Sequence, residues 1–176
     1  AWVVAIMSLP LMIKASKMEL KRLLLSIIAL FVVSHVGSAL AEGYYTLMLS
    51  RIGVACAHSI FWSIASPLAV RTVPDGKRAL ALSAIATGSS VAMVVGLPLG
   101  RVIGLYVGWR MAFMSITIIS ALIFVFILVV FPKLQSRGKF AFKQLPELLH
   151  NRVLVGVFIM SVLFATAHYT CYSYIE

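Results

Sequence analysis

The chain has few charged residues: they make up 11% of its 176 residues, and only five of them are acidic. Soluble domains carry roughly 25% charged residues, because their surfaces must face water. Apolar residues make up 62% of the chain. The composition therefore excludes a soluble enzyme, a secreted disulfide scaffold and a disordered tail, and it predicts an all-α protein that crosses a membrane several times.

Cysteine and the common catalytic motifs are also scarce or absent. The two cysteines, Cys56 and Cys171, lie in apolar runs, and their spacing fits neither a disulfide framework nor a zinc site. The sequence has no phosphate-binding loop, no nucleophile elbow and no H-E-x-x-H motif. We therefore expect no enzyme activity, no metal and no cofactor.

The apolar residues that are present form long runs separated by basic segments. A span needs about 20 apolar residues and must be helical, because lipid offers no partner for backbone polar groups. Residues 1–13 are too short to cross and are interpreted as the end of an earlier helix. Five complete spans are predicted: Leu23–Ala41, Leu47–Val70, Ala79–Val107, Met111–Phe131 and Val153–Ile175.

The distribution of the basic residues predicts the topology. The formal net charge is +10, and twelve of the fifteen lysines and arginines lie in the first, third and fifth connections. Basic loops stay in the cytoplasm, and aromatic residues gather at the interfaces, here Tyr44, Tyr45, Tyr106 and Trp109 at the outer one. This alternation indicates membrane topology rather than a basic face for nucleic acid. The long fifth connection is interpreted either as a linker on the anionic inner leaflet or as a hinge between two bundles.

Small residues recur at every fourth position of the third complete span. Such residues let two helix backbones approach closely. Pro98 lies among them and removes one backbone donor, which predicts a kink. Static packing and a sliding contact between bundles both fit this glycine ladder, which consists of Ala84, Gly88, Ala92, Gly96, Gly100, Gly104 and Gly108.

A polar stripe lies in the second complete span and consists of Arg51, Ala55, His58, Trp62 and Ser66. These positions share one helix face. An arginine inside a span indicates function, unless its side chain extends to the outer headgroups. An aromatic ring beside hydrogen-bonding groups is typical of a cavity wall and would suit a sugar.

The last span carries a second polar and aromatic group near its outer end. His168, Tyr169 and Tyr172 are predicted to line a cavity, although the tyrosines also fit interfacial anchoring. The complete spans hold no deeply placed Asp or Glu. Histidine titrates near neutral pH, so His35, His58 and His168 are the candidates for carrying protons.

Several long segments together resemble one transporter family. They are similar to the bacterial sugar efflux transporters, exporters of arabinose and lactose-type glycosides, in the drug:proton antiporter branch of the major facilitator superfamily. The resemblance covers the whole chain as about helices two to seven of twelve. The segments that carry it are 50–55, 58–63, 86–88, 95–104, 108–111 and 166–176.

The resemblance implies an organisation into parts. Residues 1–131 would form the N-terminal bundle, from the end of helix two to helix six. Residues 132–152 would be the cytoplasmic central loop, and residues 153–176 would be helix seven, which begins the C-terminal bundle. The family's helices four and seven line its central cavity. The implied substrate residues are therefore His58, Trp62, Ser66, His168, Tyr169 and Tyr172.

The resemblance also implies residues for proton coupling and for conformational change. Arg51 matches the arginine of the helix-four motif, although Ala55 and Ala57 replace its usual glycines; His58 and His168 complete the proton-coupling set. In the loop between helices two and three, Glu19, Lys21 and Arg22 replace the usual glycine and aspartate pattern. The helix-five motif is matched by Gly88, Gly96, Pro98, Gly100 and Gly104, with Arg101 in place of a usual glycine.

The expected function is export of small sugars or sugar analogues by proton antiport with alternating access. The expected location is the bacterial inner membrane, and the expected full-length state is a monomer whose partners are sugar, protons and lipid. Two alternatives remain: a multidrug:proton antiporter of the same superfamily, and a membrane scaffold subunit that transports nothing.

Overall fold

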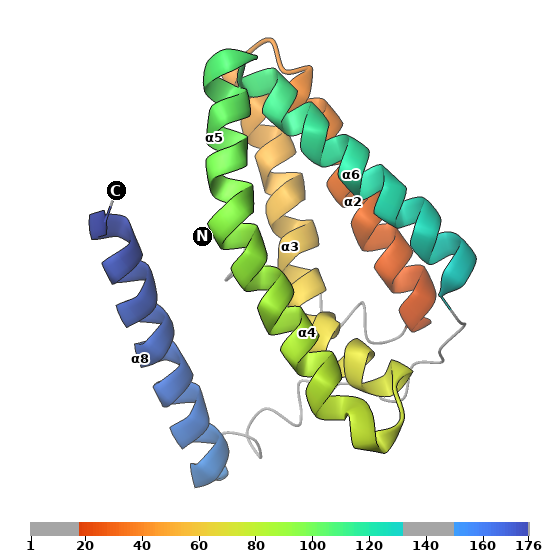
Figure 1. Cartoon of the computed structure of the whole chain (residues 1–176), viewed down its shortest axis with the longest axis vertical. Coiled ribbons are helices and arrows are strands. Elements are labelled where there is room, and N and C mark those ends of the chain that lie inside the picture. Colours follow the sequence, from red (N-terminus) through yellow and green to blue (C-terminus); the bar gives the residue numbers. More distant parts are fainter. Residues whose placement is uncertain (1–17, 132–149, 176) are drawn as a thin grey trace. The chain divides into compact units, whose positions relative to one another are not determined.

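The computed structural model describes residues 18–131 and 150–175, and every long element among them is a helix (Figure 1). The predicted all-α fold is confirmed for these residues. Residues 1–13, interpreted above as the end of an earlier helix, and most of the fifth connection lie outside the described residues. The elements are α2 (Leu20–Ala39), α3 (Tyr44–Thr72), η1 (Asp75–Lys77), α4 (Arg78–Val91), η2 (Ala92–Gly96), α5 (Leu97–Tyr106), α6 (Trp109–Val130) and α8 (Arg152–Ile175).

Four segments of the described chain are long and apolar enough to cross a membrane, and they coincide with the first four predicted spans. They are Leu20–Ala39, Tyr44–Thr72, Asp75–Tyr106 and Trp109–Val130. The fifth predicted span coincides with α8, which has 24 residues and is apolar over Arg152–Ala167. At 1.5 Å per residue, α8 is about 36 Å long, which exceeds the hydrocarbon thickness of about 30 Å.

The chain forms two units, with α2 to α6 in the first and α8 in the second. In the first unit α2 packs against both α3 and α6. The apolar side chains of α2 make up half of the buried core of the first unit. The buried residues of this core are Leu23, Leu24, Ile27 and Ile28 from α2 and Ala57, Ile60, Ile64 and Leu68 from α3.

Small and hydroxyl-bearing residues bring the C-terminal half of α2 and the N-terminal half of α3 close together. The hydroxyl oxygens of Ser38 and Ser50 are 2.8 Å apart, and Ser38 also donates to the Ser34 carbonyl oxygen at 3.0 Å. A Cβ atom placed on Gly53 would overlap the Ser34 hydroxyl. Close approach of membrane helices depends on such small residues. In the first unit this contact is made by α2 and α3, not by the glycine ladder.

The third span runs as one continuous ribbon from α4 to α5, with a π-helical segment, η2, in its middle (Figure 1). Pro98 follows directly at the start of α5. Proline cannot donate to the carbonyl four residues earlier, and a π-turn is one way to accommodate that loss. The irregularity predicted from Pro98 therefore takes the form of a wider helical turn just before it.

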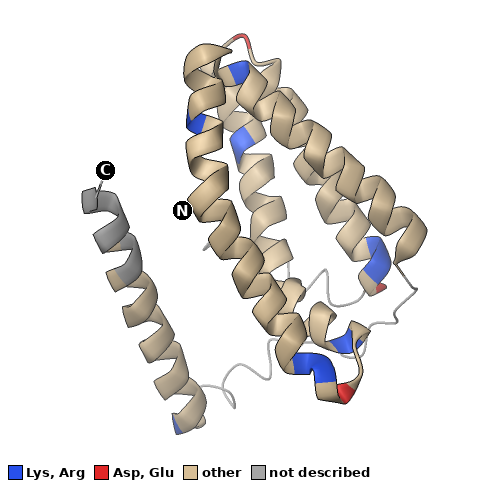
Figure 2. Ribbon diagram, in the orientation of Figure 1, with Lys and Arg blue, Asp and Glu red and all other residues tan. Residues whose placement is uncertain are grey.

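Charged residues lie at both ends of the first unit (Figure 2). The basic start of α2 meets the end of α6, where the ammonium of Lys21 donates to the carbonyl oxygens of Leu128 at 3.1 Å and Phe131 at 2.5 Å. The turn between α3 and α4 carries an ion pair of Asp75 and Arg78. Under the predicted topology, these contacts lie at the cytoplasmic end.

Candidate functional site

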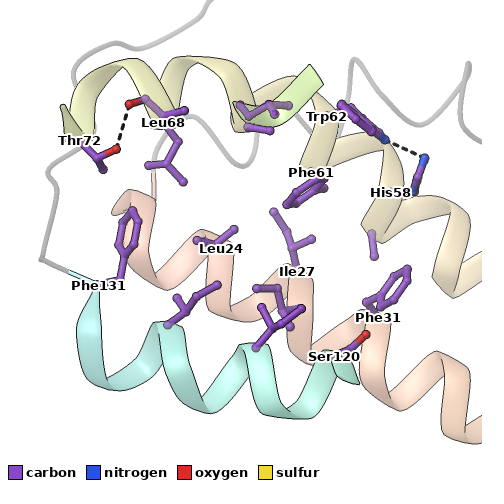
Figure 3. A pocket seen from close by; sticks show the side chains of 17 residues that line it. Leu24, Ile27, Phe31, His58, Phe61, Trp62, Leu68, Thr72, Ser120 and Phe131 are labelled. Atoms are coloured by element: carbon purple, nitrogen blue, oxygen red, sulfur yellow. Dashed lines mark hydrogen bonds between the residues drawn. The ribbon is translucent and has the colours of Figure 1, made fainter. Parts of the chain in front are cut away.

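A cavity of about 500 Å³ opens inside the first unit and is lined by α2, α3, α4 and α6 (Figure 3). Pockets for small molecules typically measure about 300–1,000 Å³. The polar lining residues are His58, Trp62, Thr72 and Ser120, and none of the lining residues is charged. The apolar lining residues are Leu24, Ile27, Ile28, Phe31, Ala57, Phe61, Ala65, Leu68, Ala69, Ile85, Ile123, Ile127 and Phe131.

The cavity occupies one end of the first unit. On α3 it extends from Ala57 to Thr72, the last residue of that helix, and on the neighbouring α6 it reaches Phe131, just past the helix end. On α2 it begins at Leu24, one turn after the helix starts. Under the predicted topology, the cavity therefore extends from the middle of the spans to the cytoplasmic side.

His58 and Trp62 form a bonded pair on the α3 wall. They lie one turn apart, and the indole Nε1–H of Trp62 donates to Nε2 of His58 at 2.8 Å (Figure 3). The two rings meet edge to face with centroids 6.0 Å apart, and Phe61 stands beside Trp62 with ring centroids 5.9 Å apart. The indole N–H can only donate, so Nε2 of His58 must accept. In this arrangement His58 is neutral and carries its proton on Nδ1.

The remaining polar members of the stripe do not line this cavity. Ser66 is exposed on α3, and Arg51 lies more than a turn beyond the cavity toward the N-terminal end of α3. The Arg51 guanidinium lies 5.4 Å from the centroid of the Phe113 ring on α6. Arg51 therefore makes a cation–π contact with α6.

Phe113 also contacts His35 of α2, whose ring centroid is 6.1 Å from that of Phe113. His35 is only 3% exposed, and its Nδ1 is 3.0 Å from the Phe31 carbonyl oxygen. His35 is predicted from the sequence as a candidate for carrying protons, but its contact with Phe113 is not predicted. Phe113 gave no signal in the sequence, because its role depends on how α6 packs against α2.

The sequence model of the Major Facilitator Superfamily matches residues 1–176, the whole chain. The chain belongs to the major facilitator superfamily. Members of this superfamily are multi-pass membrane transporters of small molecules, so the apolar helices of this chain cross a lipid bilayer. The described helices are accordingly part of a major facilitator bundle.

In this major facilitator chain, Lys21 and Arg22 lie in the first turn of α2 and Glu19 caps it, so the prediction that places these residues in a loop is wrong for Lys21 and Arg22. The contacts of the three residues stabilise two helix ends. Arg22 pairs with Glu19 at 3.2 Å across the first turn of α2. Lys21 instead reaches α6, where its positive charge meets the carbonyl groups that end the helix. One of these carbonyls belongs to Phe131, which lines the cavity. Lys21 thereby fixes the cytoplasmic rim of the cavity under the predicted topology.

The helix-five residues of this major facilitator chain form an open face of the first unit. Cβ atoms placed on Gly88, Gly96, Gly100 and Gly104 would meet nothing within 4 Å. Arg101 on the same helix is exposed. No residue of the described part of the first unit therefore occupies the space beside these glycines.

The second group of predicted cavity residues lies in the second unit. His168, Tyr169 and Tyr172 belong to α8, and their side chains lie outside the described residues. Among the residues that the structure does describe, no three His, Cys, Asp or Glu side chains gather where they could hold a metal ion.

Proposed function

We propose that the chain is part of a proton-coupled exporter of small sugars or sugar analogues in the bacterial inner membrane. The observation that carries the proposal is the His58–Trp62 pair on the wall of an uncharged cavity. An indole ring packs well against the apolar face of a sugar ring, and histidine and serine side chains hydrogen-bond hydroxyl groups. The resemblance to sugar efflux transporters supports the same substrate class.

The largely apolar lining refines the substrate. A cavity with this lining favours a sugar that carries an apolar group, such as an alkyl or aryl thiogalactoside, over a bare polyol. Burying hydroxyl groups without partners is costly, whereas an apolar substituent gains from the contact with α2 and α6. Ser120 and Thr72 offer further hydroxyl groups within the cavity.

The transport cycle in this proposal is alternating access. Residues 1–131 and the bundle that starts at residue 153 rock about a substrate site, with residues 132–152 as the connection between them. Arg51, His58 and His168 serve proton coupling. His58 and Trp62 bind substrate in the cavity of the first unit, and Ser66, His168, Tyr169 and Tyr172 bind it elsewhere along the transport path. The helix-five residues form the contact that changes as the bundles move. The full-length protein acts as a monomer.

A second candidate is a multidrug:proton antiporter of the same superfamily. The observation in its favour is that thirteen of the seventeen lining residues are apolar. No acidic side chain lines the cavity to attract a lipophilic cation. We therefore place the glycoside exporter first.

Efflux from intact cells tests the proposal. Cells with and without the full-length protein are loaded with labelled arabinose or a labelled thiogalactoside, and a protonophore is added in a parallel sample. We expect faster loss of the thiogalactoside that the protonophore abolishes. The Trp62→Ala variant should lose this export, whereas Trp109→Ala, at the outer end of α6 and outside the cavity, should retain it.

Equal loss from both kinds of cell would remove the sugar assignment. A panel of lipophilic cations then tests the second candidate. If neither class is exported, the scaffold alternative is the one that survives.

A further inference from the structure

We propose that His58 and Trp62 form the proton-controlled element of the cavity: neutral His58 holds the Trp62 ring in place as a binding wall, and protonated His58 releases it. This inference deepens the proposed function and rests on it for the statement that protons drive transport. It assigns Trp62 a coupling role in addition to its contact with substrate.

The two rings differ in their capacity for hydrogen bonding. The indole of Trp62 has a single polar hydrogen and no acceptor. Its bond to Nε2 of His58, at 2.8 Å, therefore requires that Nε2 carry no proton. When a proton adds to the Nε2 lone pair, both nitrogens become N–H donors that face each other. The hydrogen bond must then break, while the indole keeps its hydrogen and Nε2 holds the added proton.

In the described part of the first unit, no other charged side chain lines the cavity beside the pair. The side chains that α2, α4 and α6 contribute to the cavity are apolar except for Ser120 on α6. On α3 itself the remaining lining residues are apolar apart from Thr72. His58 is therefore the titratable side chain among the lining residues, and it is the lining group that can hold a proton in this cavity.

The Trp62 ring is free to change its orientation. The Trp62 residue is 47% exposed, so its ring has space to turn once the bond to His58 is lost. Phe61 contacts one edge of the ring, and the cavity lies beside it. Rotation of the indole removes the flat wall that neutral His58 holds in place, and a substrate packed against that wall loses its contact.

The resulting exchange has the direction of antiport. Substrate binds best when His58 is neutral, and proton binding favours substrate release. Binding linkage requires that substrate also disfavour protonation of His58 by the same factor. One neutral hydrogen bond contributes a modest net free energy, so we expect a change in substrate affinity of roughly two- to tenfold between the two protonation states.

Tryptophan fluorescence of the purified full-length protein tests the proposal without any substrate. The emission of Trp62 is obtained as the difference between the parent protein and its Trp62→Phe variant at each pH from about 5 to 8. We expect this difference to follow a single titration. The matched control is the difference in emission between the parent protein and its Trp109→Phe variant. The Trp109 ring contacts the Phe113 ring and the Arg110 guanidinium, so this difference should not follow the titration of a histidine.

Replacing the histidine completes the experiment. In His58→Gln, whose amide cannot be protonated in this range, the Trp62 titration should disappear; His58→Asn is the second variant if the first fails to fold. A Trp62 emission that stays constant from pH 5 to 8, or a titration that persists in both histidine variants, would overturn the proposal. Failure of thiogalactoside export with an intact titration would remove the proposed substrate and leave this coupling element standing.

Discussion

The close contact between α2 and α3 leads to a quantitative prediction for Gly53→Ala. The added methyl group would overlap the hydroxyl of Ser34 and would lie 3.3 Å from the Ser34 Cβ atom. Ser34 is 7% exposed, so its hydroxyl has little space into which it can turn. The two helices must then separate, which also stretches the bond between the Ser38 and Ser50 hydroxyl groups.

Two opposing terms set the size of the effect. Overpacking of a well-packed contact costs about 1–3 kcal/mol. Replacing glycine by alanine inside a helix returns roughly 0.5–1 kcal/mol, because the unfolded chain loses conformational freedom. We therefore expect Gly53→Ala to lower the free energy of unfolding by about 1 kcal/mol, and by no more than about 2.5 kcal/mol.

The assay is a dodecyl sulfate titration of the purified full-length protein in mixed micelles. Gly88→Ala is the matched control, because its methyl group would meet nothing within 4 Å. That control should be as stable as the parent or slightly more stable. Adding Ser34→Ala to Gly53→Ala removes the overlapping oxygen and should restore most of the lost stability. A Gly53→Ala protein as stable as Gly88→Ala, or a double variant without recovery, would refute the reasoning.

Three further predictions concern other parts of the first unit. Lys21→Met removes two charge-assisted hydrogen bonds to the end of α6 and should lower the free energy of unfolding by about 1–3 kcal/mol in the same titration. The Arg22 side chain is 79% exposed, so Arg22→Met should lower it by well under about 1 kcal/mol. Equal losses would contradict this assignment. Pro98→Ala supplies the missing N–H and should slow the initial rate of export more than it changes expression; an unchanged rate would mean that the irregular turn has no role in transport. Gly100→Leu should insert into the membrane normally yet fail to export, and normal export would show that the open glycine face makes no functional contact.

The spans were predictable because hydropathy and charge act locally along the chain. The structure places helix ends a few residues from the predicted ones, as in α2, which starts at Leu20 rather than at Leu23. The apolar run marks the part of a helix that sits in hydrocarbon, whereas the helix itself continues into the basic residues Lys21 and Arg22. The π-helical form of η2 was not predictable, since Pro98 requires an adjustment but does not select its type.

The candidate site was predictable only in part. Helical periodicity placed His58 and Trp62 on one face, and both line the cavity. The same periodicity included Arg51 and Ser66. Arg51 lies beyond the cavity, which on α3 begins at Ala57. Ser66 lies within the length of the cavity, but it is exposed and does not line it. The contributions of α2 and α6, and the bond from Lys21 to residues more than a hundred positions away, depend on tertiary packing that no local pattern encodes.

The π-helical turn in the third span has a consequence for the angular phase of the glycine ladder. In an ideal α-helix, residues four apart advance by about 400°, so each step drifts about 40° around the axis. A π-turn holds more residues per turn, and the drift through residues 92–96 is correspondingly smaller. Gly88 and Gly96 therefore stay closer to one azimuth than a regular helix would allow. The irregular turn lets a strict four-residue repeat present one nearly straight line of small residues across the middle of the span.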